Sequence, residues 1–243
     1  MSRAIEIVAD PAVAAAERIA AVVRRGGHIA LAGGSTPRRS YELLAAMDLD
    51  WSDTELWLGD DRCVGPDHEH SNYKMVNEEL VDRLPADRRP RAWHRIEGEL
   101  GPEKAAAAFE QELRASFGEG AALPVFDLIL LGIGPDAHTA SLFPNDEALA
   151  ERNRWAVGVE TPGMAPLVPR VTLTLPVLNA AREVVFLISG ADKADAVARA
   201  FGDAPGLDAP SSLVRPDPGT LTVLLDAPAA QGSAGHGDTW SYT

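Results

Sequence analysis

The sequence is short of cysteine and of positive charge. Cys63 is the single cysteine among 243 residues, which excludes an internal disulfide and a zinc site built from several cysteines, and which suits a reducing compartment. Lys and Arg number 22 against 36 Asp and Glu, a net charge of −14. This excess repels phosphodiester backbones and anionic membrane surfaces, so we expect neither nucleic acid nor membrane as a partner. An anionic substrate would need a basic pocket of its own.

Long apolar runs are also missing. No segment approaches the roughly 20 apolar residues of a membrane span. Charged residues at Arg3, Glu6, Asp10 and Glu17 interrupt the first segment, which is unlike an export signal. We therefore expect a cytoplasmic protein. Hydrophobic residues make up 46% and charged residues 24% of the chain, a composition typical of globular proteins.

Apolar strand-like segments alternate with helical segments along the chain. We expect helices from Pro11 with Asp10 as N-cap, through Tyr41–Leu44, and at 73–84, 102–117 and 192–201. Strands are expected at 4–9, 28–32, 54–58, 126–131, 155–160, 170–175, 184–189 and 220–225. The alternation predicts an α/β fold with an open, mainly parallel twisted sheet and helices on both faces. We expect one domain over 1–230 and a mobile tail over 231–243.

Ligands of open α/β sheets bind beyond the carboxyl ends of the strands, and the first unusual loop there is glycine-rich. Gly33 and Gly34 let the backbone approach a ligand, and Ser35 and Thr36 put hydroxyls and amides at the start of a helix, which favours an anion. The loop resembles a phosphate cradle, although it lacks the lysine of a nucleotide P-loop. The alternative is a plain glycine turn with a Ser/Thr cap.

The second loop carries Asp60, Asp61 and Arg62 directly after an apolar strand. Arg62 could hold a phosphate through two parallel hydrogen bonds, and the alternative is a local ion pair on a solvated loop. His68 and His70 follow at a spacing seen in metal sites. They lie in a polar loop without convincing further ligands, so we expect them to be exposed and expect no metal.

The third loop, Gly132–Ala137, fits the loose pattern G-x-G-x-x-G/A of dinucleotide enzymes. Pro135 removes an amide, and residues 138–144 do not continue as the long helix that receives a pyrophosphate. The remaining feature is His138 two residues from Asp136, with Thr139 and Ser141 nearby, which suits a general base with an orienting carboxylate. Lysine occurs only at Lys74, Lys104 and Lys193, and Lys193 could reach an anion after Gly190.

Together these loops resemble the 6-phosphogluconolactonase family, within the wider glucosamine-6-phosphate deaminase/isomerase-like fold. The matching segments are GGSTP at 33–37, DDR at 60–62, SN at 71–72, LLGIGPDAHTASLFP at 130–144, RVTLT at 170–174 and G-x-x-K at 190–193. The resemblance implies hydrolysis of 6-phospho-D-glucono-1,5-lactone to 6-phosphogluconate, the second step of the oxidative pentose phosphate pathway. It implies no required cofactor. We expect a monomer or a weakly associating homodimer.

The resemblance also assigns roles to individual residues. His138 becomes the base that activates water, and Asp136 becomes its orienting neighbour. The substrate and phosphate contacts become Gly34, Ser35, Thr36, Arg62, Arg170 and Lys193, with Asp60, Asp61, Thr139 and Ser141 in support. Ser141 as a nucleophile is possible but unnecessary.

Two positions depart from the family pattern. Ala137 stands where the family usually has glycine, and a positive φ there would cost about 1 kcal/mol. Asp61 stands where the family usually has glutamate. We expect activity with altered constants.

Two rival functions remain. Amino-sugar phosphate deaminases carry a glutamate where this chain has Phe143, and phenylalanine cannot transfer a proton. A phosphosugar-binding regulator would carry a basic helix-turn-helix segment. We do not expect one in this acidic chain, because there is no room for it before the first βα unit. Retention of both Asp136 and His138 favours catalysis.

Overall fold

A computed structural model describes residues 2–202, 204–231 and 240–242. Its main feature is an eight-stranded sheet in the order β11-β1-β10-β9-β6-β2-β3-β5, in which every paired neighbour is parallel. The strands are β1 (Ser2–Ile7), β2 (Gly27–Leu31), β3 (Thr54–Leu58), β5 (Ala92–Trp93), β6 (Leu128–Leu131), β9 (Glu183–Ile188), β10 (Thr220–Leu225) and β11 (Trp240–Tyr242). The predicted α/β class with a mainly parallel sheet is confirmed.

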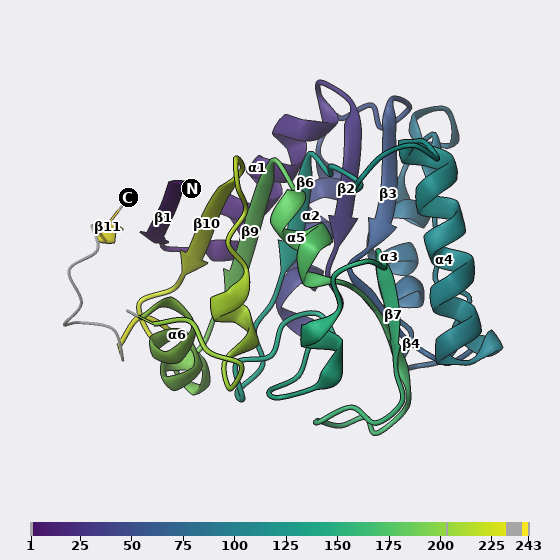
Figure 1. The fold of residues 1–243 in the computed structure, drawn as a ribbon. Helices are drawn as coiled ribbons and strands as arrows, with labels where there is room; N and C mark the ends of the chain where they lie inside the picture. Colours follow the sequence, from purple (N-terminus) through teal and green to yellow (C-terminus); the bar gives the residue numbers. More distant parts are fainter. Residues whose placement is uncertain (1, 203, 232–239, 243) are drawn as a thin grey trace.

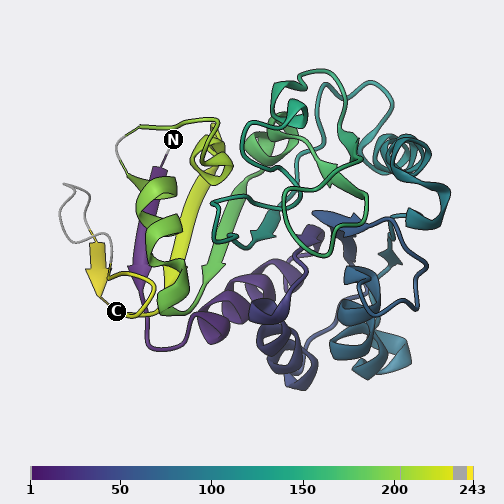
Figure 2. The ribbon, with the colours of Figure 1, turned by 90° about the horizontal axis from the view of Figure 1, so that it is seen from below.

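Helices cover both faces of this sheet. They are α1 (Pro11–Val23), α2 (Ser35–Ala46), α3 (Asn72–Glu79), α4 (Pro102–Phe117), α5 (Leu175–Ala180) and α6 (Ala194–Phe201). Figure 2 shows α1, α2 and α3, in purple to blue, on one side of the sheet and α4 and α5 on the other. The side chain of Asp10 accepts hydrogen bonds from the amides of Ala12 and Val13, which confirms the predicted N-cap.

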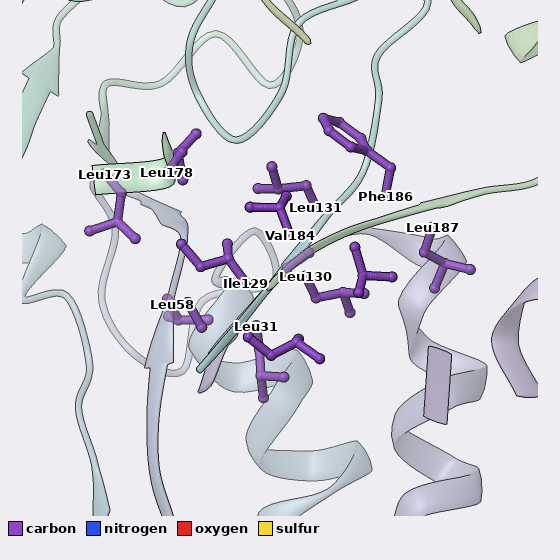
Figure 3. Packing of buried hydrophobic residues seen from close by; sticks show 14 of the residues in the cluster. Leu31, Leu58, Ile129, Leu130, Leu131, Leu173, Leu178, Val184, Phe186 and Leu187 are labelled. Carbon is purple, nitrogen blue, oxygen red and sulfur yellow. The ribbon is translucent and has the colours of Figure 1, made fainter. Parts of the chain in front are cut away.

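The core lies along the central strands, which are apolar on both faces as a buried parallel sheet requires. All four residues of β6 are buried. Figure 3 shows Ile129 and Val184, from neighbouring strands, on the same side of the sheet as Leu173 and Leu178, and Leu31 on the other side. None of these five side chains is exposed to solvent. This packing provides a rigid platform beneath the loops at the strand ends.

Two predicted strands belong to a different sheet. Segments 155–160 and 170–175 form β7 (Ala156–Val159) and β8 (Arg170–Leu173), which join β4 (Asp60–Arg62) in a three-stranded antiparallel sheet of order β4-β8-β7. The chain leaves β3 at Gly59, and the Gly59 carbonyl accepts a hydrogen bond from the Leu173 amide. Tertiary pairing of this kind leaves no periodicity signal in the sequence.

Other element boundaries shift by a few residues. The helix predicted over 73–84 ends as α3 at Glu79 and is followed by a 3-10 turn over Val81–Arg83. The helix predicted from 192 begins with a 3-10 turn over Ala191–Lys193. Within the predicted tail, β11 pairs in parallel with β1, while 232–239 and 243 lie outside the described residues. The domain boundary at residue 230 stays a prediction. No helix among the described residues is long and apolar enough to cross a membrane.

Glu55 on β3 lies in a cluster of charged and polar side chains from several elements. Its carboxylate lies 2.7 Å from Nη2 of Arg91 and 3.2 Å from Nε2 of His94, and it accepts a hydrogen bond from the Ser116 hydroxyl at 2.5 Å. Burial alone would raise the pKa of Glu55, but the hydrogen bonds from Ser116, Arg91 and His94 outweigh burial and hold the pKa at about 2. The fold therefore favours the ionised form.

We expect the Glu55→Gln variant to unfold at lower temperature than the wild type at neutral pH. A carboxyl group with a depressed pKa stabilises the fold above its unfolded value of 4.5, and the stabilisation is lost as the pH falls toward about 2. The difference in melting temperature should therefore narrow at about pH 3. Glu112→Gln is the control, because that carboxylate is 45% exposed and contacts only His94 among these residues, at 3.3 Å. A difference for Glu55→Gln that is constant with pH would contradict the assignment.

Candidate active site

Four loops converge at the carboxyl ends of four adjacent central strands. The loops follow β9, β6, β2 and β3, which are consecutive in the sheet, and Figure 1 shows the arrowheads of β2, β3 and β10 pointing to the same lower edge. A cavity of about 220 Å³ opens there. Strands far apart in sequence thus bring together the loops in which the sequence predicts chemistry.

Most of the predicted site residues line this cavity. Those that do are Gly34, Ser35, Thr36, Asp60, Arg62, His138, Arg170 and Lys193. Four others lie behind the wall and contact the lining residues, namely Asp61, Asp136, Thr139 and Ser141.

His138 and Asp136 form a close pair. Nδ1 of His138 lies 2.5 Å from Oδ1 of Asp136, and the same oxygen accepts the His138 amide at 3.1 Å. Burial would raise the pKa of Asp136, but its hydrogen bond with the His138 ring and the nearby imidazole charge lower it below its usual range. The ionised Asp136 places the ring proton on Nδ1, which leaves Nε2 free to accept a proton.

The backbone around this pair is tightly constrained. A Cβ on Gly134 would lie 2.1 Å from Nδ1 of His138, so only glycine fits there. Ala137 is fully buried and has φ +66°, which is the left-handed conformation expected where the family usually has glycine. Its Cβ costs about 1 kcal/mol in this conformation, so the loop holds some strain between the carboxylate and the imidazole.

Thr139 and Ser141 support the site from behind. The Thr139 hydroxyl donates to the Gly132 carbonyl at 2.9 Å. The Ser141 hydroxyl donates to Oδ2 of Asp60 at 2.6 Å, and Ser141 is fully buried. Ser141 therefore orients Asp60 toward the cavity, and its buried hydroxyl is poorly placed to attack a ligand.

Arg62 and Arg170 face each other across two antiparallel strands. They are register partners in the β4–β8 pair, so their side chains leave the same face of the small sheet. Nε of each guanidinium is buried without a hydrogen-bond partner. Burial lowers the pKa of Arg170, an effect that Asp60 opposes and Arg62 reinforces. A buried cation, Arg170, and a half-buried one, Arg62, each with an unused donor, are suited to binding an anion.

The start of α2 offers a second set of donors. Its N-cap residue Gly34 has φ +94° and no side chain to satisfy the first amides of the helix, and Ser35 and Thr36 line the cavity. Lys193 also lines the cavity, and its Nζ lies 3.1 Å from the exposed carboxylate of Asp192. Helix dipole, hydroxyls and ammonium group together favour a phosphate.

Asp226 holds the loop that carries Lys193. Its carboxylate accepts the Gly190 amide at 3.0 Å and also the hydroxyl of Ser189. The sequence offers no signal for this role, because the contact joins the ends of β9 and β10.

Asn72 is a lining residue that the sequence does not assign a role, although it belongs to the SN motif at 71–72. Its Nδ2 donates to the Asp60 carbonyl at 2.9 Å, and its Oδ1 accepts from Nη1 of Arg62 at 2.9 Å. A Cβ on Gly33 would lie 1.9 Å from Oδ1 of Asn72. Asn72 thus joins the glycine loop to the two charged residues of β4.

Asp60 and Asp61 have different environments. Asp60 lines the cavity. Asp61 accepts the amides of Arg62, Asn72 and Tyr73 and the hydroxyl of Ser71, and so caps the start of α3. Burial raises the pKa of Asp61 to about 6, against these backbone hydrogen bonds.

The two aspartates should therefore respond differently to amidation. In Asp61→Asn an NH2 group would face backbone N–H donors, so we expect a loss of about 1–3 kcal/mol of unfolding free energy. In Asp60→Asn the amide oxygen can still accept the Ser141 hydroxyl, so turnover should change more than stability. Denaturant unfolding and steady-state kinetics of both variants test this. An equal loss of stability in both would contradict the distinction.

Metal ligation has no support among the residues that the structure describes, since no group of three or more His, Cys, Asp or Glu side chains there could hold an ion. His68 is exposed and His70 is half-buried. The rings of His68 and His70 lie 5.2 Å apart, and the His70 carbonyl accepts a hydrogen bond from Arg62.

Comparison with known proteins identifies the family of this chain. The family model described as glucosamine-6-phosphate isomerases/6-phosphogluconolactonase matches residues 2–223. A 6-phosphogluconolactonase from a Nostoc species is 42% identical over 206 residues, covering 83% of this chain and 82% of the relative. A 6-phosphogluconolactonase from Mycobacterium tuberculosis is 38% identical over 246 residues, covering 95% and 98%.

A solved structure adds the fold. The solved structure of 6-phosphogluconolactonase from Trypanosoma brucei superposes with a TM-score of 0.82 at 29% identity, covering 95% of this chain and 98% of the other. The match of fold, of sequence and of the family model extends over nearly the whole described chain. The protein belongs to the glucosamine-6-phosphate isomerase/6-phosphogluconolactonase family.

Proposed function

We propose that this protein hydrolyses 6-phospho-D-glucono-1,5-lactone to 6-phospho-D-gluconate, the second step of the oxidative pentose phosphate pathway, with His138 as the base. The observation that carries the proposal is the His138–Asp136 pair in one cavity with two arginines whose Nε atoms are buried and unpaired. The names of the relatives supply the substrate class. His138 supplies a base that can activate water, and Arg62 and Arg170 supply positive charge for the phosphate of the substrate.

The phosphate of the substrate binds the cationic part of the cavity. Its contacts are the first amides and hydroxyls of α2 at Ser35 and Thr36, with Lys193 and the guanidiniums of Arg62 and Arg170. A phosphate dianion offsets the repulsion between two like charges that face each other across a strand pair. Binding energy at this remote group also orients the lactone ring over His138.

His138 then acts on water. Neutral Nε2 takes a proton from a water molecule as the water oxygen attacks C1 of the lactone, and Asp136 stabilises the imidazolium that forms. The tetrahedral intermediate collapses by breaking the bond between C1 and the ring oxygen, and the imidazolium returns its proton to that oxygen. The new carboxylic acid releases a proton to solvent. Backbone amides and cationic side chains lining the cavity stabilise the oxyanion.

The step needs no covalent intermediate and no cofactor, because the lactone is an activated ester and water is a sufficient nucleophile. Phe143 supports hydrolysis over amino-sugar isomerisation. Its ring centroid lies 4.6 Å from that of His138, and an aromatic side chain there cannot shuttle a proton between carbon atoms. The monomer or weak homodimer and the cytoplasmic location stay predictions.

A coupled assay tests the proposal. A dehydrogenase generates the lactone from glucose 6-phosphate, and 6-phosphogluconate formation is followed with and without this protein at neutral pH. We expect a rate well above spontaneous opening of the lactone. A rate equal to the spontaneous one at high protein concentration would overturn the proposed function.

A further inference from the structure

Ser211 makes two hydrogen bonds to the loop that holds the His138–Asp136 pair. It lies in a 3-10 turn over Pro210–Leu213 and is fully buried. Its amide donates to the Ala137 carbonyl at 3.0 Å, and its hydroxyl donates to the same oxygen at 2.9 Å. Ser211 is 74 residues away in sequence and is not among the residues that line the cavity.

The acceptor of these bonds belongs to a peptide plane that is part of the base. The Ala137 carbonyl and the His138 amide share one planar peptide unit. The amide end of that unit donates to Oδ1 of Asp136 at 3.1 Å, and the same oxygen receives Nδ1 of His138 at 2.5 Å. Holding the carbonyl end therefore sets the orientation of the amide that positions Asp136 and, through it, the imidazole.

This unit needs holding, because Ala137 has φ +66°. Alanine prefers the right-handed region by about 1 kcal/mol or more, so an unrestrained loop would tend to rotate away and turn the His138 amide off Asp136. Two hydrogen bonds to one buried carbonyl oppose that rotation. Ser211 thus bonds the strained residue that links Asp136 to His138, the two residues proposed to carry out the reaction.

We propose that Ser211 is a positioning residue that holds the Ala137–His138 peptide, and thereby the Asp136–His138 pair, in the orientation required for water activation. The proposal rests on the proposed lactone hydrolysis for its kinetic consequences. Its structural consequence, the alignment of the imidazole with Asp136, is measurable without turnover.

The first test is the Ser211→Ala variant, which removes the hydroxyl and keeps the backbone amide. We expect kcat to fall about 3- to 10-fold, the effect of one net hydrogen bond, with KM unchanged because Ser211 lies outside the cavity lining. Ser212→Ala is the matched control. Ser212 lies in the same turn and is also buried, but its hydroxyl contacts Gly206, so kcat should stay at the wild-type value.

The second test combines Ser211→Ala with Ala137→Gly. Glycine adopts positive φ without the penalty that alanine has, so the loss in kcat caused by Ser211→Ala should be smaller in the Ala137→Gly background than in the wild type. An equal or larger loss would overturn the link between the strain at Ala137 and the hydroxyl. If Ser211→Ala does not fold, Ser211→Cys, with a similar volume and a weaker donor, is measured by the same criteria.

The third test is an NMR spectrum of the His138 imidazole, assigned by its absence in His138→Ala. The resonance of the Nδ1 proton reports the hydrogen bond to Asp136, so it should shift in Ser211→Ala, because a misaligned Asp136 makes a poorer hydrogen bond. It should be unchanged in Ser212→Ala. An unchanged resonance together with an unchanged kcat in Ser211→Ala would overturn the positioning role, as would a rise in KM alone. If the wild type has no lactonase activity but the resonance still shifts in Ser211→Ala, the proposed function is refuted and the positioning role is supported.

Discussion

Replacing His138 with alanine should lower kcat for 6-phosphogluconolactone hydrolysis by about 10²- to 10⁴-fold, the usual contribution of a positioned general base. The variant should keep its fold, since the His138 ring is on the cavity wall and 15% exposed, and it should still bind substrate. KM should therefore change little. The measurement is steady-state kinetics in the coupled assay, corrected for spontaneous opening of the lactone.

His68→Ala serves as the matched control, because His68 is an exposed histidine on the loop before α3. Its rate should equal that of the wild type. A His138→Ala variant with an unchanged rate would remove the proposed base. An unchanged kcat with a strongly raised KM would show that His138 binds the substrate and does not act as the base.

Replacing Arg62 or Arg170 with methionine should raise KM by roughly ten- to a hundredfold, the effect of losing one charge-assisted hydrogen bond to a phosphate. Methionine keeps much of the buried volume and removes the charge, so the change reports on the anion. Both residues should matter, since they face each other on β4 and β8 and each has an unpaired Nε. The kcat of each variant should fall less than that of His138→Ala.

Arg182→Gln is the control for net charge. Arg182 lies just before β9, at the opposite edge of the sheet from the cavity, and is 68% exposed, so its loss should leave KM unchanged. A direct binding measurement complements the kinetics. Added 6-phosphogluconate should raise the melting temperature of the wild type and raise it less in Arg62→Met and Arg170→Met. Equal shifts in all three proteins would place the anion elsewhere.

Local patterns were sufficient to predict two of the loops that line this cavity. Gly33–Thr36 and Gly132–His138 each follow a strand, and the turn chemistry of both segments is visible in a single sequence. The structure adds that Ala137, at the position where the family usually has glycine, has φ +66°. Asp10 capping α1 is equally local, because an N-cap contacts amides two or three residues away.

Contacts between distant segments were not predictable in the same way. The pairing of Arg62 with Arg170 depends on an antiparallel sheet whose strands β4 and β8 are more than 100 residues apart in the sequence. The separate roles of Asp60 and Asp61 depend on where Asn72 and Tyr73 present their amides. The hydrogen bonds from Ser211 to the Ala137 carbonyl join residues that are 74 positions apart in the sequence. Hydrophobic periodicity carries no information on any of these pairings.

The sequence by itself determined the α/β class and most of the order of strands and helices, because these depend on apolar periodicity and turn chemistry over a few residues. The resemblance of its loops to a known family supplied the rest of the candidate site residues. Only the tertiary structure decided which of those residues share a cavity and which support it from behind. Parallel strand order aligned four carboxyl ends at one edge, and burial then distinguished Asp60 in the cavity from Asp61 at the cap of α3.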